Sequence, residues 1–234
     1  LSNVIIKADD TQLKLSSTNL DILCSEQISA NIDISGEISV PAITLHEIVK
    51  KLPQGSDIDI SMDETGNSIN IKSGRSRFNL STLPTDDFPD ISQDDLSVKF
   101  VMSVDDLKTM IDKTKFAISN EESRYYLNGI FFHSAHKNGI DVLRSVATDG
   151  HRLAQYDMPL PHGAEKMSGI IIPKKTTLEL RRILDDANGD VQIELSSSKV
   201  KFVFSEIELV SKVIDGTFPD YTKVIPENND KKLK

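Results

Sequence analysis

The chain has 234 residues, enough for one large domain or for two of ordinary size. Its formal net charge of -9, from 27 Lys and Arg against 36 Asp and Glu, argues against a protein that binds nucleic acid over its whole surface, so any contact with DNA needs a local basic stripe. A single cysteine, Cys24, excludes an internal disulfide framework, and the lack of Cys and His clusters and of long apolar runs predicts a soluble cytoplasmic protein without a metal or other cofactor.

Period-two alternation is the commonest pattern along the chain, and it predicts strands with one buried face. The clearest case is residues 28–34, where apolar side chains at Ile28, Ala30, Ile32 and Ile34 alternate with polar ones. Three hairpins are also predicted, one of them around Asn138-Gly139, a pair preferred in tight turns. They join residues 58–62 to 68–72, 130–132 to 140–142, and 191–195 to 200–204.

Three segments have the 3.6-residue spacing of amphipathic helices. In the first, Leu45, Ile48, Val49 and Leu52 form an apolar stripe shortly after Pro41, a residue common at helix starts. The other two segments cover about residues 103–119 and 174–186. Many strands and few helices indicate the α+β class.

A repeat of about 130 residues organises the chain. Val40-Pro41 matches Ile172-Pro173, the helix that follows each pair has similar residues, and each unit ends on Phe-Pro-Asp, at 88–90 and at 218–220. The helix predicted at 103–119 has no counterpart in the first copy. We therefore expect two copies of one module, of which the first lacks its opening part.

The predicted helices carry basic residues on the faces opposite their apolar stripes. Lys50 and Lys51 lie on the first helix, and Lys108 and Lys115 on the second, where Asp105, Asp106 and Asp112 dilute them. Lys174, Lys175, Arg181 and Arg182 are expected to share an exposed stripe of the third helix, since the matching pairs are seven residues apart. From spacing alone, a solvated helix surface is the simpler explanation. The basic run around Arg75 suits a phosphate contact but is short.

Polar groups are concentrated in Ala147-Thr-Asp-Gly-His-Arg-Leu-Ala154, and three interpretations stay open. Asp149 and His151 would be an acid/base dyad of a hydrolase that activates Ser145 or Thr148, although residues two apart on a strand merely share a face. Alternatively, Asp-Gly forms a tight turn in which Asp149 caps local amides. In the third interpretation, His151 and Arg152 frame an apolar binding pocket that includes Leu127, Leu153, Pro219 and Val224.

Several motifs in one order resemble the bacterial beta sliding clamp family, the beta subunits of DNA polymerase III. They are Ser73-Gly-Arg-Ser-Arg-Phe78, Leu80-Ser-Thr-Leu-Pro84, Arg124-Tyr-Tyr-Leu-Asn-Gly129, Ala147 to Ala154, and Phe218-Pro-Asp-Tyr221. The resemblance implies tandem clamp modules, three to a subunit, in a ring of two subunits with antiparallel sheets outside and helices that line a DNA channel. This chain then has most of the first module at 1–94, the second at 95–222, and at 223–234 a connector to a third that it lacks.

The resemblance also implies a function without chemistry: processivity of the replicative polymerase. Implied partners are double-stranded DNA, DNA polymerase III, the clamp loader, and other polymerases and repair proteins that carry short linear motifs. The implied DNA-facing residues are Lys50, Lys51, Arg75, Lys108, Lys115, Tyr125, Tyr126, Lys174, Lys175, Arg181 and Arg182. The implied hydrophobic peptide cleft comprises Leu127, Thr148, Gly150, His151, Arg152, Leu153, Pro219, Lys223 and Val224.

Net acidity agrees with a clamp, because a ring held by topology needs only weak, screened contacts with DNA. The family's ring interface joins the first module to the third, so this chain by itself is expected to be a monomer. A generic DNA-binding module would instead bind short linear duplex with a steep salt dependence.

Overall fold

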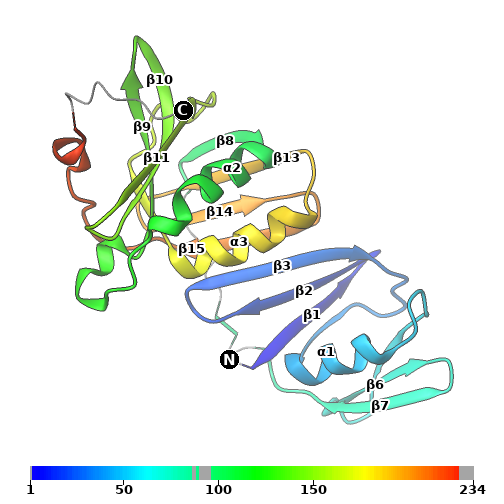
Figure 1. Ribbon diagram of the computed structural model, residues 1–234. Coiled ribbons are helices and arrows are strands. Elements are labelled where there is room, and N and C mark those ends of the chain that lie inside the picture. Colours follow the sequence, from blue (N-terminus) through cyan, green and yellow to red (C-terminus); the bar gives the residue numbers. More distant parts are fainter. Residues whose placement is uncertain (1, 86–87, 90–95, 227–234) are drawn as a thin grey trace.

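The structure, a computed structural model, describes residues 2–85, 88–89 and 96–226. In this part of the chain the strands form an eight-stranded sheet in the order β4-β1-β2-β3-β15-β14-β13-β8, a four-stranded sheet β11-β10-β9-β12 and a three-stranded sheet β5-β6-β7. The strand pairs of these sheets are antiparallel, and the α+β expectation is confirmed (Figure 1). The predicted boundary at 94/95, and the predicted connector from residue 227 onward, lie outside the described residues.

The strands and helices have the following bounds. The strands are β1 (Asn3–Asp9), β2 (Gln12–Thr18), β3 (Ile22–Ser29), β4 (Gly36–Pro41), β5 (Asp59–Met62), β6 (Ser68–Ser73), β7 (Ser76–Ser81), β8 (Val98–Ser103), β9 (Gly129–Lys137), β10 (Ile140–Thr148), β11 (Leu153–Pro159), β12 (Ile170–Pro173), β13 (Asp190–Leu195), β14 (Lys199–Val203) and β15 (Ile207–Lys212). The helices are α1 (Ala42–Lys51), α2 (Val104–Thr114) and α3 (Lys174–Asp186), with 3-10 turns η1 (Lys115–Ala117), η2 (Glu122–Leu127) and η3 (Tyr221–Val224).

The repeat is visible in the order of the elements. Strands β1–β4, helix α1 and strands β5–β7 recur as β9–β12, α3 and β13–β15, and the order β4-β1-β2-β3 recurs as β12-β9-β10-β11. We call these the first and the second unit. In the second unit β8 and α2 come first, and β8 pairs with β13. Residues 2–85 contain no counterpart of β8 and α2, and β5, the counterpart of β13, is an edge strand.

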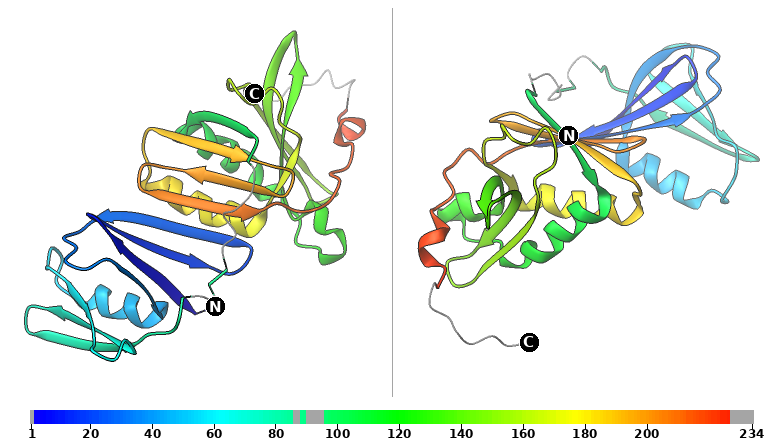
Figure 2. Two further views of the ribbon diagram at one scale, coloured as in Figure 1. Left: turned by 180° about the vertical axis from the view of Figure 1, so that it is seen from behind. Right: turned by 90° about the horizontal axis from the view of Figure 1, so that it is seen from above.

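One sheet runs through both units, because β3 of the first pairs with β15 of the second. Cys24 lies opposite Leu209 in this pair, and Lys14 on β2 reaches Glu208 with an Nζ–Oε2 distance of 3.4 Å. The three α-helices lie on the same side of this sheet (Figure 2, right). Among the described residues, no helix is long and apolar enough to span a membrane.

Each unit has its own core. In the second unit the apolar faces of α2 and α3 pack against the sheets through Leu107, Met110, Leu180 and other buried side chains. The smaller core of the first unit includes Leu45 and Ile48 of α1. The predicted apolar stripes are thus confirmed, except that Val49 is 43% exposed and that Leu52, which follows the last residue of α1, is only half-buried.

The three predicted hairpins are confirmed as β5–β6, β9–β10 and β13–β14. Asn138 and Gly139 both have positive φ, 52° and 84°, as the tight turn between β9 and β10 requires. The helix predicted over 103–119 ends earlier, at Thr114. The Thr114 hydroxyl donates to the Met110 carbonyl at 2.8 Å, a side-chain bond that competes with continued helix, and a 3-10 turn follows.

The strand predicted across residues 28–34 is wrong in its second half. Strand β3 ends at Ser29, and the Ala30 amide turns back to donate to the Thr11 carbonyl at 3.0 Å. Ile28 is 45% exposed and Ile34 is 86% exposed, so the alternation does not correspond to a buried face. The chain needs this segment to reverse into β4, and the turn overrides the local pattern.

Candidate functional sites

The turn between β10 and β11 is held by its own side chains. Asp149 Oδ1 accepts hydrogen bonds from the amides of His151 at 2.9 Å and Arg152 at 3.0 Å. The Thr148 hydroxyl accepts from the Gly150 amide at 3.1 Å and donates to the Arg152 carbonyl at 2.7 Å. Gly150 has a φ of 88°, which favours glycine, and a Cβ there would lie 2.6 Å from Arg124 Nη1.

These contacts support the turn interpretation and not the acid/base dyad. Hydrogen bonds from the Arg152 and His151 amides lower the pKa of Asp149 to about 2, so its carboxylate is fixed as an acceptor for its own turn. The proposed nucleophiles are also occupied: Ser145 is fully buried and donates to the Met110 carbonyl, and Thr148 belongs to the turn. The positions of Asp149, Ser145 and Thr148 therefore do not support the hydrolase interpretation.

The side chain of Arg152 extends from the turn along the surface. Its Nε lies 3.1 Å from Asp149 Oδ2, and its guanidinium lies 5.8 Å from the ring centroid of Phe116, which is 56% exposed. The side chains of His151 and Arg152 are exposed. A fixed cation beside an exposed aromatic ring suits a binding surface.

A separate apolar cluster lies beside this turn. Leu127, Val146, Ile171, Phe218 and Tyr221 are buried in it, with Leu153 packed against them. The chain after Phe218 then exposes Pro219, Lys223 and Val224, the last of which is 69% exposed. The predicted cleft residues thus come from η2, the end of β10, the β10–β11 turn, the start of β11 and the 218–224 segment, with Leu127 beneath the surface and Val224 on it.

The basic residues of α2 and α3 are largely paired with carboxylates, which the sequence-based expectation of an open basic stripe missed. The two helices lie side by side (Figure 1). Lys108 Nζ lies 2.9 Å from Asp185, and Arg181 lies 2.8 Å from Asp112 and 2.6 Å from Asp185. Hydrogen bonds from Arg181 and Lys108 lower the pKa of Asp185 to about 2. Lys115 pairs with Asp112 in the same way, at 2.5 Å.

The expectation that Lys174 and Arg181 share one exposed stripe with Lys175 and Arg182 is wrong. Arg181 has only 19% of its side chain exposed, and Lys174 donates to Asn120. Arg182 is exposed and pairs with Glu179 at 3.0 Å. Of the predicted DNA-facing basic residues on the described helices, Lys50, Lys51 and Lys175 are the ones with neither an ion pair nor a side-chain hydrogen bond, so their cations are available to a phosphate.

The remaining predicted DNA-facing residues lie elsewhere. Tyr125 is 53% exposed and meets Tyr126 edge to face, while Tyr126 packs against the cluster that contains Leu127. Arg75 lies in the turn between β6 and β7, not on a helix. Their contact with DNA stays a prediction.

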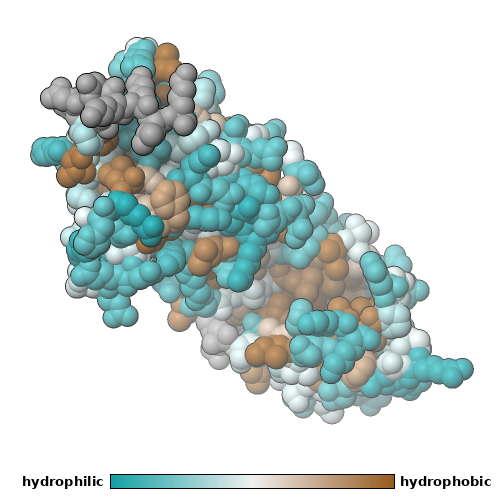
Figure 3. Space-filling model, viewed as in Figure 1, coloured by the Kyte–Doolittle hydropathy of each residue, from teal (hydrophilic) through white to brown (hydrophobic). Residues whose placement is uncertain are grey.

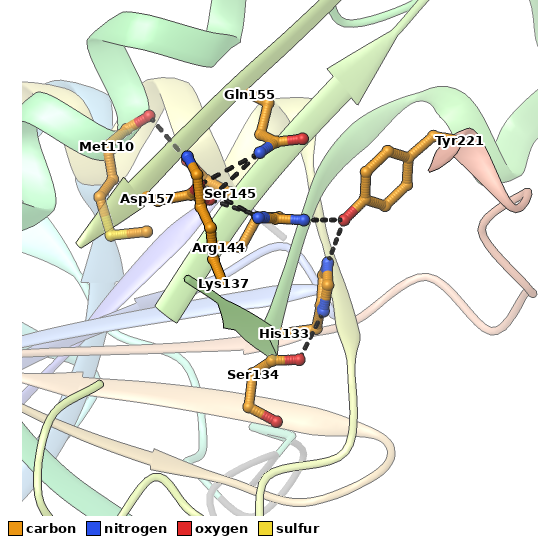
Figure 4. Close-up of polar contacts among 9 residues, drawn as sticks. All are labelled: Met110, His133, Ser134, Lys137, Arg144, Ser145, Gln155, Asp157 and Tyr221. Carbon is orange, nitrogen blue, oxygen red and sulfur yellow. Dashed lines mark hydrogen bonds and ion pairs between the residues drawn. The ribbon is translucent and has the colours of Figure 1, made fainter. Parts of the chain in front are cut away.

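Sequence reasoning missed the polar group beneath the 218–224 segment, shown in Figure 4. His133 on β9, Arg144 on β10 and Asp157 on β11 are cross-strand neighbours, and Tyr221 lies against them. A signal was present, because the predicted Asn138-Gly139 turn sets His133 opposite Arg144.

Comparisons with known proteins agree with this arrangement. Residues 1–92 match the family model of the DNA polymerase III beta subunit, N-terminal domain, and residues 101–220 match that of its central domain. The beta sliding clamp of Caulobacter vibrioides is 48% identical over 233 residues, which cover 100% of this chain and 63% of the relative. That of Pseudomonas aeruginosa is 40% identical over 232 residues, which cover 99% of this chain and 62% of the relative.

Solved structures give the same result. The structure of pol III beta from Caulobacter crescentus matches with a TM-score of 0.95 at 48% identity, over 99% of this chain and 63% of that chain. A sliding clamp from Bartonella birtlesii, bound to griselimycin, matches with a TM-score of 0.94 at 48% identity, over 98% of this chain and 61% of that chain.

The fold, with antiparallel sheets and helices on one side, is therefore that of the DNA sliding clamps. The chain belongs to the DNA polymerase III beta subunit family. It spans less than two thirds of the length of these relatives.

Proposed function

We propose that this chain supplies two adjacent modules, divided near residues 94 and 95, of a cytoplasmic sliding clamp that encircles duplex DNA and confers processivity on the replicative polymerase. The observation that carries the proposal is the sheet that continues from one unit into the next through the β3–β15 pair. An edge-to-edge joint of this kind can be repeated by every further module.

The free sheet edges support closure into a ring. β11 is the counterpart of β3 in the repeat, and β7 is the counterpart of β15; each is an edge strand of its sheet. β11 therefore has the edge that would accept a third module, and β7 the edge that would accept the last module of a partner subunit. A closed ring leaves none of these edges unpaired.

The helix side of the sheet is the proposed DNA side. There Lys50, Lys51 and Lys175 offer unpaired cations, while carboxylates hold Arg181 and Lys108. Few free cations mean few displaced counterions and a shallow dependence of DNA binding on salt. A ring retained by topology can slide on such weak contacts.

The proposed partner site is the surface formed by the β10–β11 turn and the 218–224 segment. Apolar side chains such as the buried Leu127 and the half-buried Leu153 would anchor a short peptide, and His151 and Arg152 would bind its oxygen atoms. The proposed partners are DNA polymerase III, the clamp loader, and other polymerases and repair proteins with short linear motifs.

Griselimycin, bound to the Bartonella birtlesii relative, is the probe for this site. We expect calorimetric titration to show that it binds the unaltered chain, and that His151→Ala weakens binding about 3- to 10-fold, as loss of one polar contact does. Asp21→Ala is the matched control, since Asp21 is the residue of the first unit that corresponds to His151. Absence of binding, or equal affinity in all three proteins, would contradict the proposed site.

The oligomeric state gives a second test. Because closure needs a third module, we expect light scattering to give the mass of one 26.0 kDa chain. A stable dimer of this chain at micromolar concentration would count against the proposed ring geometry.

A further inference from the structure

The segment that exposes Pro219, Lys223 and Val224 is short; Phe218 is buried just before it, and Tyr221 is the buried side chain of η3 itself. Tyr221, at the start of η3, is 6% exposed. Its ring lies near Phe218 and His133, with centroid distances of 6.3 Å and 5.9 Å. Within the described part of the chain, the side chains of Thr222 and Lys223 bond to Asp220, next to η3 in the sequence, and not to the sheet. The inward attachment of η3 therefore depends on Tyr221.

The Tyr221 hydroxyl lies between two polar groups of the sheet (Figure 4). It is 2.8 Å from His133 Nε2 and 3.2 Å from Arg144 Nη1. A guanidinium can only donate, so the hydroxyl accepts from Arg144 and has its own proton available for His133.

The protonation state of His133 follows from its other nitrogen. Nδ1 lies 2.7 Å from the Ser134 carbonyl, which can only accept, so Nδ1 carries the proton and Nε2 accepts from Tyr221. Burial, with the nearby Arg144 cation, lowers the pKa of His133 and keeps the ring neutral, although the Ser134 bond and Asp157 act the other way. The bonds therefore run in one direction, from Arg144 through Tyr221 to His133.

Arg144 is itself held by the neighbouring strand. Its Nε and Nη2 lie 2.6 Å and 3.1 Å from the two carboxylate oxygens of Asp157, a bidentate pair. Lys137 and Gln155 also donate to Asp157, at 2.6 Å and 3.2 Å. The side chains of Arg144 and Asp157 are only 11% and 10% exposed, so this cation has little freedom to move.

We propose that His133 and Arg144 are positioning residues, which hold the Tyr221 hydroxyl and thereby fix η3 as one wall of the peptide site. The inference deepens the proposed function and rests on it for the link to partner binding. None of the three side chains needs to touch the bound peptide. Their effect passes through the position of Lys223 and Val224.

Tyr221→Phe is the most conservative test of this role of the hydroxyl, because it removes the hydroxyl and keeps the ring. We expect griselimycin to bind about fivefold more weakly, the effect of one lost hydrogen bond, and amide hydrogen exchange to rise in residues 218–226 with little change in β9–β11. Tyr156→Phe, on β11 and outside the site, is the matched control and should change neither measurement.

His133 provides the rescue experiment. His133→Leu removes the acceptor and should reproduce the effects of Tyr221→Phe, whereas His133→Gln offers a carbonyl oxygen and should recover at least half of the lost affinity. If Tyr221→Phe and His133→Leu act through the same bond, the double variant should bind no more weakly than either single variant.

The outcomes separate the inference from the proposed function. Unchanged exchange at 218–226 in a folded Tyr221→Phe chain would overturn the inference, as would equal affinity of His133→Leu and His133→Gln. If the unaltered chain fails to bind griselimycin, the partner site fails while the exchange experiment still decides the role of Tyr221. If Tyr221→Phe does not fold, His133→Leu decides in its place.

Discussion

Two turns at equivalent places in the repeat have the same hydrogen bonds and different exposed side chains. In the first unit, Asn19 Oδ1 accepts from the amides of Asp21 and Ile22 at 3.1 Å and 2.9 Å, and the Thr18 hydroxyl accepts from the Leu20 amide and donates to the Ile22 carbonyl. In the second, Asp149 and Thr148 make the corresponding four bonds. Leu20 and Gly150 both have positive φ, 79° and 88°.

The hydrogen bonds that the two turns share belong to the module, and the side chains in which they differ belong to the proposed site. The neutral Asn19 accepts the same two amide hydrogen bonds as Asp149, so the turn does not require the charge of Asp149. This pattern of hydrogen bonds therefore belongs to the module. His151 and Arg152 replace Asp21 and Ile22, and only the second turn lies beside the apolar cluster of Leu127. The proposed partner site therefore differs from its counterpart in the side chains that a shared backbone turn carries.

The units also differ in how their helices are covered. In the second unit α2 packs against α3, whereas α1 contacts strands of its own unit. Figure 3 shows hydrophilic residues over α2 and α3 and a hydrophobic area over the first unit, near β1–β3 and α1. Ile43 of α1 is 75% exposed. The second unit should accordingly be the more stable of the two.

The largest expected effect tests that difference in stability. Leu180 of α3 is fully buried, and its counterpart Ile48 of α1 is 9% exposed in a smaller core. We expect Leu180→Ala to lower the free energy of unfolding by about 4 kcal/mol and Ile48→Ala by about 2 kcal/mol. Urea denaturation followed by circular dichroism measures both. An equal loss, or a larger loss for Ile48→Ala, would refute the ranking of the two units.

A second prediction concerns substitutions at Gly150 and Leu20, the two turn residues with positive φ. Gly150→Ala is expected to cost about 1–2 kcal/mol, since alanine is strained there and its Cβ would meet Arg124. Leu20→Gly should relieve the same backbone strain and cost nothing or stabilise the chain by up to about 1 kcal/mol. The temperature of thermal unfolding should fall for Gly150→Ala and stay the same or rise for Leu20→Gly, and a fall of similar size in both variants would contradict the equivalence of the turns.

The pH dependence of the two turns should also differ. The pKa of Asp149 is lowered from 3.8 to about 2, so its stabilising effect is complete above its ordinary pKa and is lost as the pH falls through about 2. Asn19 does not titrate. Between pH 5 and pH 2, the amide chemical shifts of His151 and Arg152 should follow the Asp149 carboxylate, whereas the Asn19 side chain contributes no such change to the Ile22 amide. Asp149→Asn should remove the difference.

The smallest expected effect concerns the basic residues. Lys50 and Lys51 have no ion pair in the described part of the chain, whereas Lys108 and Arg181 are held by Asp185 and Asp112. We expect Lys50→Ala with Lys51→Ala to reduce the salt slope of binding to short duplex DNA by about 2. Lys108→Ala with Arg181→Ala should change it less. Fluorescence anisotropy at low salt can compare the pairs, and equal slopes would mean that the ion pairs open for DNA.

Much of the fold could be predicted because its signals are local. The Asn138-Gly139 turn sets a hairpin register, and the stripes of α1 and α3 follow a helical period. The prediction for the segment around Ile34 was wrong because the alternation of apolar and polar residues continues past Ser29, where β3 ends and the chain turns back. Local spacing has no information about such a reversal.

The candidate site could be predicted only in part. The repeat and the motifs locate His151, Arg152 and the 218–224 segment. The pairing of Arg181 with Asp112 and the anchoring of Tyr221 by Arg144 join elements distant in sequence, so they depend on how helices and strands pack. The sequence shows the Lys and Arg residues of the helices but not the carboxylates that pair with them, so the predicted helix faces were too basic.

The central claim, that function resides in the second turn and not in its counterpart, can be tested by mapping griselimycin onto the chain by amide NMR. We predict chemical shift changes in residues 148–153 and 218–226 and none in residues 18–22. Changes at both turns, or changes confined to other parts of the chain, would contradict the account.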